Sequence, residues 1–260
     1  MQGATLEKLF DLTGRVALVT GAGTGLGRGF ALTLAAAGAT VAVAARRSDR
    51  LAATVNEIGA QAGTAAAFSL DVTDRERLAV VFDEIEERFG VVDIVVNNAG
   101  IARSGLLTDT ADADWDAVID VNLTAVHRVG AEAVRRLLAA GRAGSIINIA
   151  SVLGVRVSAG LGAYIAAKSA VVQLTKAQAL EWGPRGIRAN AIAPGYFETD
   201  INTGYFDTPA GQAMVERIPL RRIGEIEELQ GALLLLASNA GSYINGSIIN
   251  VDGGHLCSSL

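Results

Sequence analysis

Hydrophobic positions along the chain follow two alternating patterns. Short β-branched runs bounded by glycine are followed by longer stretches in which apolar residues recur with helical period. This alternation predicts strands that each lead into a covering helix, as in a parallel sheet with helices on both faces. The expected strands are Val16–Thr20, Thr40–Ala45, Ala65–Leu70, Asp93–Asn97, Ser145–Ala150, Arg188–Ala193 and Ser247–Val251. The expected helices are Leu26–Ala37, Ser48–Gln61, Asp74–Phe89, Asp112–Ala140, Ala163–Trp182 and Glu225–Ser238, with a shorter segment, helical or mobile, near Thr208–Arg217.

Neither a linker nor an internal repeat interrupts this alternation, so residues 1–260 are expected to form one α/β domain. Its predicted core is a doubly wound parallel sheet of seven strands with helices on both faces. The segment at about 195–222 departs from short-loop packing, because it follows Pro194 and contains Pro209 and Pro219. Loops of that length in compact domains often have a function, which makes this segment the candidate substrate loop.

Composition excludes several classes of protein. Half of the residues are hydrophobic and 19% are charged, which excludes a disordered chain, and the one cysteine, Cys257, excludes a disulfide scaffold. The net charge of −5 does not provide the excess of positive charge that is typical of proteins that bind nucleic acid or an anionic membrane. Residues 1–15 contain no continuous apolar signal region, and no apolar stretch reaches the roughly 20 residues that span a bilayer. We therefore expect a soluble, cytoplasmic protein that acts on small molecules.

A glycine-rich loop follows the first predicted strand. Thr20–Gly27 has the spacing Gly21-x-x-x-Gly25-x-Gly27, and an apolar helical run begins directly after it. Glycine lets the backbone turn tightly and approach a ligand, while the free N–H groups and the helix dipole at a helix start attract an anion. The loop therefore predicts a dinucleotide pyrophosphate site on a Rossmann-type fold.

The end of the second predicted strand indicates which dinucleotide is preferred. An acidic residue there would bond the ribose 2′-hydroxyl, whereas arginine can pair with a 2′-phosphate. The sequence has Arg46 and Arg47 at this point and no carboxylate. Arg46 therefore favours NADP(H), and NAD(H) is the alternative if both arginines are simply solvated.

A phenol and an ammonium group lie four residues apart at Tyr164 and Lys168, which places them on one face of a predicted helix. A neighbouring cation favours the phenolate and is expected to move the tyrosine pKa toward the neutral range. Ser151 follows the predicted strand Ser145–Ala150, and the carboxyl ends of such strands are where ligands bind. The three side chains are candidates for acid-base chemistry.

In this order and at these separations, the residues resemble those of the classical short-chain dehydrogenase/reductase family, and the resemblance covers nearly the whole chain. The positions that carry it are Thr20–Gly27, Asp71, Val72, Asn97–Gly100, Asn122, Ser151, Tyr164, Lys168, Pro194, Gly195 and Thr199.

The resemblance implies hydride transfer between NADP(H) and a carbonyl or secondary alcohol. The implied catalytic residues are Tyr164 for the proton, Ser151 for the substrate oxygen, Lys168 for the tyrosine and the nicotinamide ribose, and Asn122 for a water in the proton relay. Asp71 and Val72 are implied at the adenine, Asn98 along the cofactor, and Phe197 and Thr199 at the nicotinamide amide. The full expected cofactor set is Gly21, Thr24, Gly25, Leu26, Gly27, Arg46, Asp71, Val72, Asn98, Tyr164, Lys168, Phe197 and Thr199.

Other classes of function fit less well. His127 and His255 lack the spacing of a metal site, so no metal is expected. The chain also has no G-x-S-x-G nucleophile turn and no Gly-Lys-Ser/Thr phosphate loop. A cofactor-binding regulator without turnover remains the alternative outside enzymology, and the presence of both Tyr164 and Lys168 disfavours it.

The sequence leaves the substrate open. Aromatic residues of the substrate loop, among them Tyr196, Tyr205 and Phe206, favour a partly apolar carbonyl compound. Arg156 and Arg222 are among the arginines that would suit an anionic substrate. Within the resemblance, 3-oxoacyl-thioester reductases, NAD-dependent sugar-acid or polyol dehydrogenases and general carbonyl reductases share these motifs. The family also implies a homo-oligomer, a tetramer or a dimer, formed through the long helices and the last strand.

Overall fold

The computed structural model describes residues 6–199 and 203–258. In this part of the chain seven strands form one sheet, and each strand runs parallel to its neighbours in the order β3-β2-β1-β4-β5-β6-β7. The strands are β1 Val16–Thr20, β2 Thr40–Ala45, β3 Thr64–Ser69, β4 Ile94–Asn97, β5 Gly144–Ile149, β6 Ile187–Pro194 and β7 Ile248–Val251. The predicted seven-stranded parallel sheet is confirmed.

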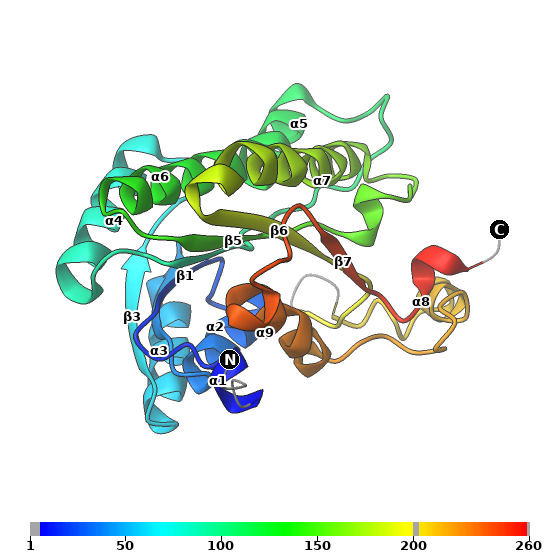
Figure 1. The fold of residues 1–260 in the computed structure, drawn as a ribbon. Coiled ribbons are helices and arrows are strands. Elements are labelled where there is room, and N and C mark those ends of the chain that lie inside the picture. Colours follow the sequence, from blue (N-terminus) through cyan, green and yellow to red (C-terminus); the bar gives the residue numbers. More distant parts are fainter. Residues whose placement is uncertain (1–5, 200–202, 259–260) are drawn as a thin grey trace.

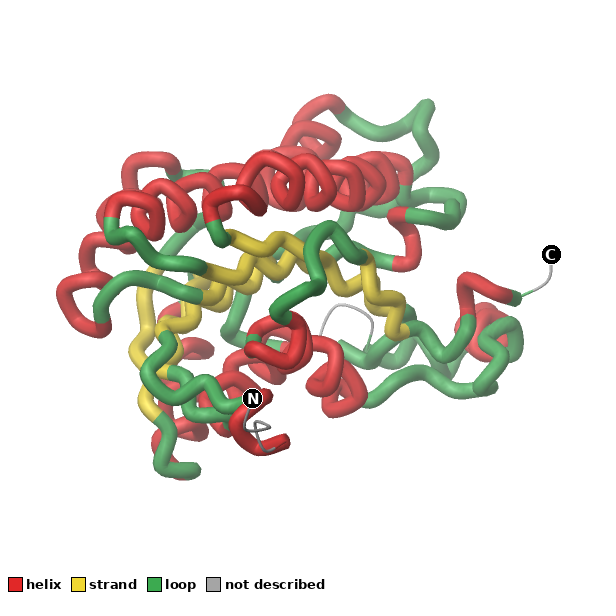
Figure 2. Tube along the Cα trace, in the orientation of Figure 1, coloured by secondary structure: helices red, strands yellow, loops and turns green. Residues whose placement is uncertain are grey.

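Helices cover both faces of the sheet. Figure 1 shows α4, α5, α6 and α7 over one face and α2, α3 and α9 over the other, and Figure 2 shows the strands as a layer between them. The helices are α1 Leu6–Phe10, α2 Gly25–Ala36, α3 Ser48–Ala60, α4 Arg75–Phe89, α5 Asp112–Ile119, α6 Ala125–Ala139, α7 Gly162–Trp182, α8 Pro209–Val215 and α9 Gln230–Ala237. The doubly wound fold is therefore confirmed as well.

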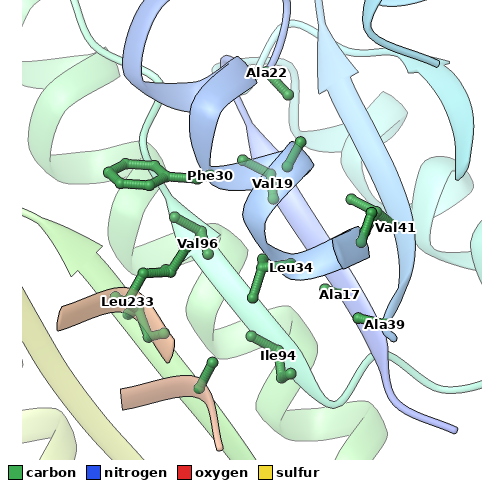
Figure 3. Close-up of a cluster of buried hydrophobic side chains, with 14 of the residues drawn as sticks. Ala17, Val19, Ala22, Phe30, Leu34, Ala39, Val41, Ile94, Val96 and Leu233 are labelled. Atoms are coloured by element: carbon green, nitrogen blue, oxygen red, sulfur yellow. The ribbon is translucent and has the colours of Figure 1, made fainter. Parts of the chain in front are cut away.

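Side chains of the central strands alternate between two buried cores. On β1, Ala17 and Val19 join the core beneath α2 and α9, and Leu18 joins the core beneath α4 and α6. Figure 3 shows Phe30 of α2 packed in the first of these cores. Full burial of a large apolar side chain is worth about 1.5–3 kcal/mol, so the two cores stabilise the central strands of the sheet.

The strand order creates a crevice at the carboxyl end of β1. The chain moves to one side of β1 through β2 and β3 and then returns to the other side with β4. Connections that leave in opposite directions separate above β1, and ligands of open α/β sheets bind at such a point. The glycine loop after β1 and Asn98 after β4 both lie at this point.

The predicted helix Asp112–Ala140 is wrong as a continuous α-helix. The π-helical turn Asp120–Thr124 separates α5 from α6. Asn122 lies within this turn, and its Nδ2 donates to Val118 O at 2.9 Å. Side-chain competition for a carbonyl of the preceding turn disturbs the regular helical ladder, and π turns are frequent at functional sites.

Smaller differences concern the ends of elements. The segment predicted as the helix Glu225–Ser238 begins with the 3₁₀ turn Ile226–Leu229 before α9, and α1 has no predicted counterpart. Residues 200–202 of the predicted substrate loop lie outside the described residues. The loop's helical segment is α8, which begins at Pro209 with Thr208 as its N-cap.

Candidate functional site

The glycine loop is anchored to both strands that border the crevice. Thr20 Oγ1 accepts from the Asn98 and Ala99 amides at 3.0 and 3.1 Å. The Asn98 side chain donates to Thr20 O at 3.0 Å and Gly21 O at 3.3 Å. The Gly21 amide donates to Ala44 O of β2 at 2.8 Å. These bonds fix the loop in place. The Asn98 side chain therefore positions the backbone of the glycine loop.

Three glycines of the loop are required by its geometry. Gly21 and Gly25 have φ values of +67° and +52°, which other residues rarely adopt. A Cβ at Gly27 would overlap Gly21 O and the Asn98 side chain. The close fit explains the spacing Gly21-x-x-x-Gly25-x-Gly27 in terms of backbone conformation and packing.

The start of α2 suits a phosphate group. Thr24 is its N-cap residue, and its side chain makes no capping hydrogen bond to the first turn. The first amides of a helix have no partner within the helix, and the dipole makes this end positive. The residues present therefore fit the pyrophosphate of a dinucleotide. Leu26 packs against the core and Thr199 approaches Gly25, so both expected residues border this loop.

Asp71 and Arg46 lie near each other at the ends of β3 and β2. Asp71 Oδ1 accepts from Thr73 N at 3.0 Å and Thr73 Oγ1 at 2.7 Å. Desolvation acts to raise the pKa of Asp71, but these hydrogen bonds and the Arg46 charge bring it below its ordinary value. Arg46 Nη1 lies 4.0 Å from Asp71 Oδ2, and the Arg46 side chain is 71% exposed. Val72 is buried beside Asp71. A charged guanidinium is thus available to an anion at this edge.

Tyr164, Ser151 and Lys168 come together beyond the end of β5. The Ser151 side chain lies close enough to Tyr164 to act on the pKa of its phenol, which it lowers. Ser151 Oγ accepts from the Leu153 amide at 3.1 Å, so its own proton is free to point to another oxygen. Lys168 is buried, with Nζ 5.6 Å from the centre of the Tyr164 ring, and donates to Ile149 O at 2.7 Å. The arrangement brings a hydroxyl, a phenol and an amine close together.

The pKa values in this cluster differ from the sequence expectation. Burial raises the pKa of Tyr164, the Ser151 hydrogen bond opposes this change, and the nearby Tyr196 adds to it. Burial also lowers the pKa of Lys168 to about 8. The pKa of Tyr164 therefore lies above its ordinary value and not, as expected, closer to the neutral range, because burial disfavours the phenolate. Tyr164 is a protonated phenol at neutral pH and hence a proton donor.

The Lys168 pKa predicts a pH dependence of stability. Between pH about 8 and the ordinary lysine pKa of 10.5, Lys168 keeps in the unfolded chain a proton that it has released in the folded protein. The free energy of unfolding is therefore expected to rise with pH across this interval. Lys168→Met removes the contribution, so wild type should gain stability relative to the variant between pH about 7 and about 10, measured by urea unfolding. Parallel curves for the two proteins over this range would contradict the prediction.

Asn122 binds backbone on two sides. Its Nδ2 donates to Ile101 O at 2.7 Å and Val118 O at 2.9 Å, and its Oδ1 accepts from the Ile101 amide at 3.2 Å. The side chain thus joins the π turn to the segment after β4. Its expected place in a proton relay stays a prediction, and the observed contacts give it a positioning role.

The remaining expected residue, Phe197, is 5% exposed and lies in the core under α2 and α9. Its ring packs against Gly224, where a Cβ would overlap it. Phe197 thus fixes the start of the substrate loop, and its contact with a nucleotide stays a prediction.

A buried polar network was missed by the sequence reasoning. Asn97 Nδ2 donates to Asn148 Oδ1 at 2.9 Å, and Asn148 Nδ2 donates to Thr175 Oγ1 and Gln178 Oε1 at 2.9 and 2.8 Å. The four side chains join β4 and β5 to α7, the helix that carries Tyr164 and Lys168. Amides at positions of otherwise apolar strands are the signal that would have indicated such a network.

Among residues 6–199 and 203–258, no group of three or more histidine, cysteine, aspartate or glutamate side chains is placed to hold a metal ion. No helix within these ranges is both long and apolar enough to cross a membrane.

Comparison with known proteins gave matches along nearly the whole chain. The family model described as enoyl-(acyl carrier protein) reductase matches residues 21–255. The 3-oxoacyl-[acyl-carrier-protein] reductase FabG of Thermotoga maritima is 40% identical over 243 residues, which cover 94% of this chain and 98% of the relative. Gluconate 5-dehydrogenase of Gluconobacter oxydans is 38% identical over 247 residues, which cover 95% of this chain and 96% of the relative.

Solved structures are also similar to this chain over nearly its whole length. The crystal structure of a gluconate 5-dehydrogenase from Burkholderia cenocepacia, in complex with NADP and tartrate, superposes with a TM-score of 0.93 at 38% identity. The match covers 98% of this chain and 100% of that one. The relatives thus include enzymes named for acyl thioesters and enzymes named for sugar acids.

Proposed function

The chain belongs to the classical short-chain dehydrogenase/reductase family, and on this premise we propose that it is an NADP(H)-preferring oxidoreductase that interconverts a carbonyl compound and a secondary alcohol. The observation that carries the proposal is the meeting of Ser151, Tyr164 and Lys168 at the sheet edge that also carries the glycine loop. The solved relative from Burkholderia cenocepacia holds NADP, which supports the choice of cofactor.

When bound, the nicotinamide supplies or accepts the hydride. Tyr164 provides the proton to the substrate oxygen during reduction, because its raised pKa keeps the phenol protonated at neutral pH. Ser151 donates a second hydrogen bond to the same oxygen, and this bond strengthens as negative charge develops there. In the oxidative direction Tyr164 must first lose its own proton, and its phenolate then takes the proton from the alcohol.

Lys168 is positioned beside Tyr164 to bind the ribose of the cofactor. Its Nζ is fixed by Ile149 O, and it has further protons with which to bind the ribose hydroxyls of the cofactor. Asn122 holds Ile101, the residue after Gly100, and a Cβ at Gly100 would lie 3.9 Å from Lys168 Nζ. The backbone after β4 therefore forms one wall of the same site.

Arg46 is proposed to select NADP(H) by pairing with the 2′-phosphate. Loss of one charge-assisted contact costs about 1.5–3 kcal/mol, so Arg46→Ala should raise the KM for NADPH by about 10- to 100-fold and change the KM for NADH little. The measurement is the steady-state rate with each cofactor at fixed carbonyl substrate. Arg185→Ala, an exposed arginine after α7, is the control for overall charge. Equal effects of Arg46→Ala on both cofactors would refute this role.

We propose that residues 1–260 act as one domain in which the segment at about 195–222 contacts the substrate. An NAD-dependent sugar-acid or polyol dehydrogenase is the second candidate, and the relatives named as gluconate dehydrogenases favour that substrate class. The intact pair Tyr164 and Lys168 argues against a regulator without turnover.

A cytoplasmic homo-oligomer, with a tetramer as the expected form, completes the proposal. Exposed apolar side chains on α5 and α7, Trp115 and Leu180, support an association through these helices. The enzymatic proposal is tested by following NADPH consumption with a ketone, a 3-oxo ester and a keto-sugar acid. Turnover of none of them by protein that binds NADPH would refute it.

A further inference from the structure

Arg156 joins the segment after Ser151 to the turn that follows β7. Its Nη1 and Nη2 donate to Ser258 Oγ and Ser258 O at 2.8 and 2.6 Å. The sequence makes Arg156 a candidate for binding an anionic substrate, but in the structure its guanidinium binds two oxygens of this turn. Arg222, another such candidate, donates to both carboxylate oxygens of Glu228 at 2.6 Å. The role of Arg156 therefore depends on what the turn holds.

The segment that carries Arg156 is fixed to α7, the helix that carries Tyr164 and Lys168. Ser169 Oγ of α7 donates to Gly154 O at 3.1 Å. A Cβ at Gly154 would lie 2.9 Å from Lys168 O, so the backbone at this position packs directly on the helix. Arg156 follows only two residues later. Its segment is therefore held close to the side chains proposed for the chemistry.

The turn after β7, residues 252–258, is held together by its own hydrogen bonds. The Asp252 carboxylate accepts from two amides of the turn at 2.9 and 2.8 Å. Ser258 Oγ donates to His255 O at 2.9 Å. Figure 1 shows the turn beyond the end of β7. Because these bonds join its two halves, the guanidinium contact at Ser258 fixes the position of the whole turn.

This turn contacts the substrate loop near both ends of the loop. Near the first end, the His255 ring meets the Tyr196 ring edge to face, with centroids 5.3 Å apart. Tyr196 meets Phe206 of the same loop in the same way, with centroids 6.3 Å apart. Near the other end, the Leu220 amide donates to Gly253 O at 3.2 Å. The position of the loop is therefore tied to the position of the turn.

The end of the loop that borders the cofactor site has separate anchors. Phe197 lies in the core under α2 and α9, with its ring against Gly224. Thr199 lies against the glycine loop. Neither contact involves the turn after β7. Loss of the Arg156 contact should therefore loosen residues 203–220 and leave the cofactor side of the loop in place.

We propose that Arg156 is a positioning residue for the carbonyl substrate: by holding Ser258, it keeps residues 203–220 of the substrate loop in the conformation that binds substrate. This inference rests on the function proposed above, and Arg156 acts through the loop without touching the substrate. When only a fraction of molecules has the loop in place, the apparent affinity falls by that fraction. Loss of the contact should therefore raise KM and leave kcat nearly unchanged.

The first test is steady-state kinetics of Arg156→Met, which removes the guanidinium and keeps an unbranched side chain. The assay uses NADPH with ethyl acetoacetate or 5-ketogluconate, whichever wild type turns over faster. KM for the carbonyl compound should rise about tenfold, with kcat within about twofold of wild type. A loss of folded protein would instead lower kcat at an unchanged KM.

A second variant tests the same contact from the other side. Ser258→Ala removes one of the two accepting oxygens and should raise KM about threefold. In combination with Arg156→Met it should have no further effect, because the contact is already lost. Effects of the two variants that simply multiply would contradict the proposal.

Arg185→Met is the matched control, because Arg185 is an exposed arginine on the turn after α7. Its KM should equal that of wild type. The Kd for NADPH, measured by fluorescence titration, should be unchanged in every variant. An unchanged KM in Arg156→Met would overturn the proposal, as would an NADPH affinity that falls as much as KM rises.

Hydrogen exchange separates this proposal from the enzymatic one, because it needs no turnover. In protein saturated with NADP⁺, the amides of residues 203–220 should exchange about tenfold faster in Arg156→Met than in wild type, and those of α7 at the same rate. Unchanged exchange in a variant of an active enzyme refutes the role of Arg156 alone. Faster exchange in a protein whose wild type turns over no carbonyl compound refutes the enzymatic proposal alone.

Discussion

Replacing Tyr164 by phenylalanine is expected to lower kcat for carbonyl reduction by about 10³-fold or more, because the reaction then lacks its positioned proton donor. The ring and its packing remain, so the affinity for NADPH, measured by fluorescence titration, should change little. The loss in kcat should persist across substrates, because the proton goes to the carbonyl oxygen that all of them share.

Tyr243→Phe is the matched control for removal of a phenol, since Tyr243 is fully exposed. Its kcat should equal that of wild type. A Tyr164→Phe enzyme with kcat within a few fold of wild type would show that another group supplies the proton, and the assignment of Tyr164 would fail.

Gly27→Ala is expected to disable the glycine loop. The added Cβ would overlap Gly21 O and the Asn98 side chain, both of which are held by hydrogen bonds. Overpacking of this kind costs about 1–3 kcal/mol, and the loop that should receive the pyrophosphate must shift to relieve it. NADPH affinity should fall by about 100-fold or more, with a lowered Tm.

Gly59→Ala on α3 gives the matched control, because a Cβ there meets no atom within 4 Å. This variant should keep its NADPH affinity and be as stable as wild type or more so. Normal NADPH binding by Gly27→Ala would mean that the loop does not hold the cofactor.

Features that depend on local patterns could be predicted from the sequence. The buried runs of β1 and β4 needed only their apolar composition and bounding glycines. The loop at Gly21 needed only its place between a strand and a helix. Tyr164 and Lys168 share a helix face by spacing alone, and the family resemblance then linked them to Ser151.

Features that depend on contacts between distant segments could not be predicted. The π turn at Asn122 arises with bonds to Ile101, 21 residues away. Burial raises the pKa of Tyr164, and the spacing of residues in a sequence does not reveal burial. Arg156 binds Ser258 across 102 residues, a contact that no local sequence pattern indicates.

The central claim is that this site moves a hydride between NADP(H) and a carbonyl carbon, with Tyr164 as the proton donor. The most direct test uses NADPH that carries deuterium at C4 of the nicotinamide, with the carbonyl substrates named above and mass analysis of the alcohol. Wild type should place deuterium on the carbinol carbon of the alcohol, and Tyr164→Phe should form almost no alcohol. Alcohol formed without deuterium from either C4 position, or formed by the variant at the rate of wild type, would contradict the claim.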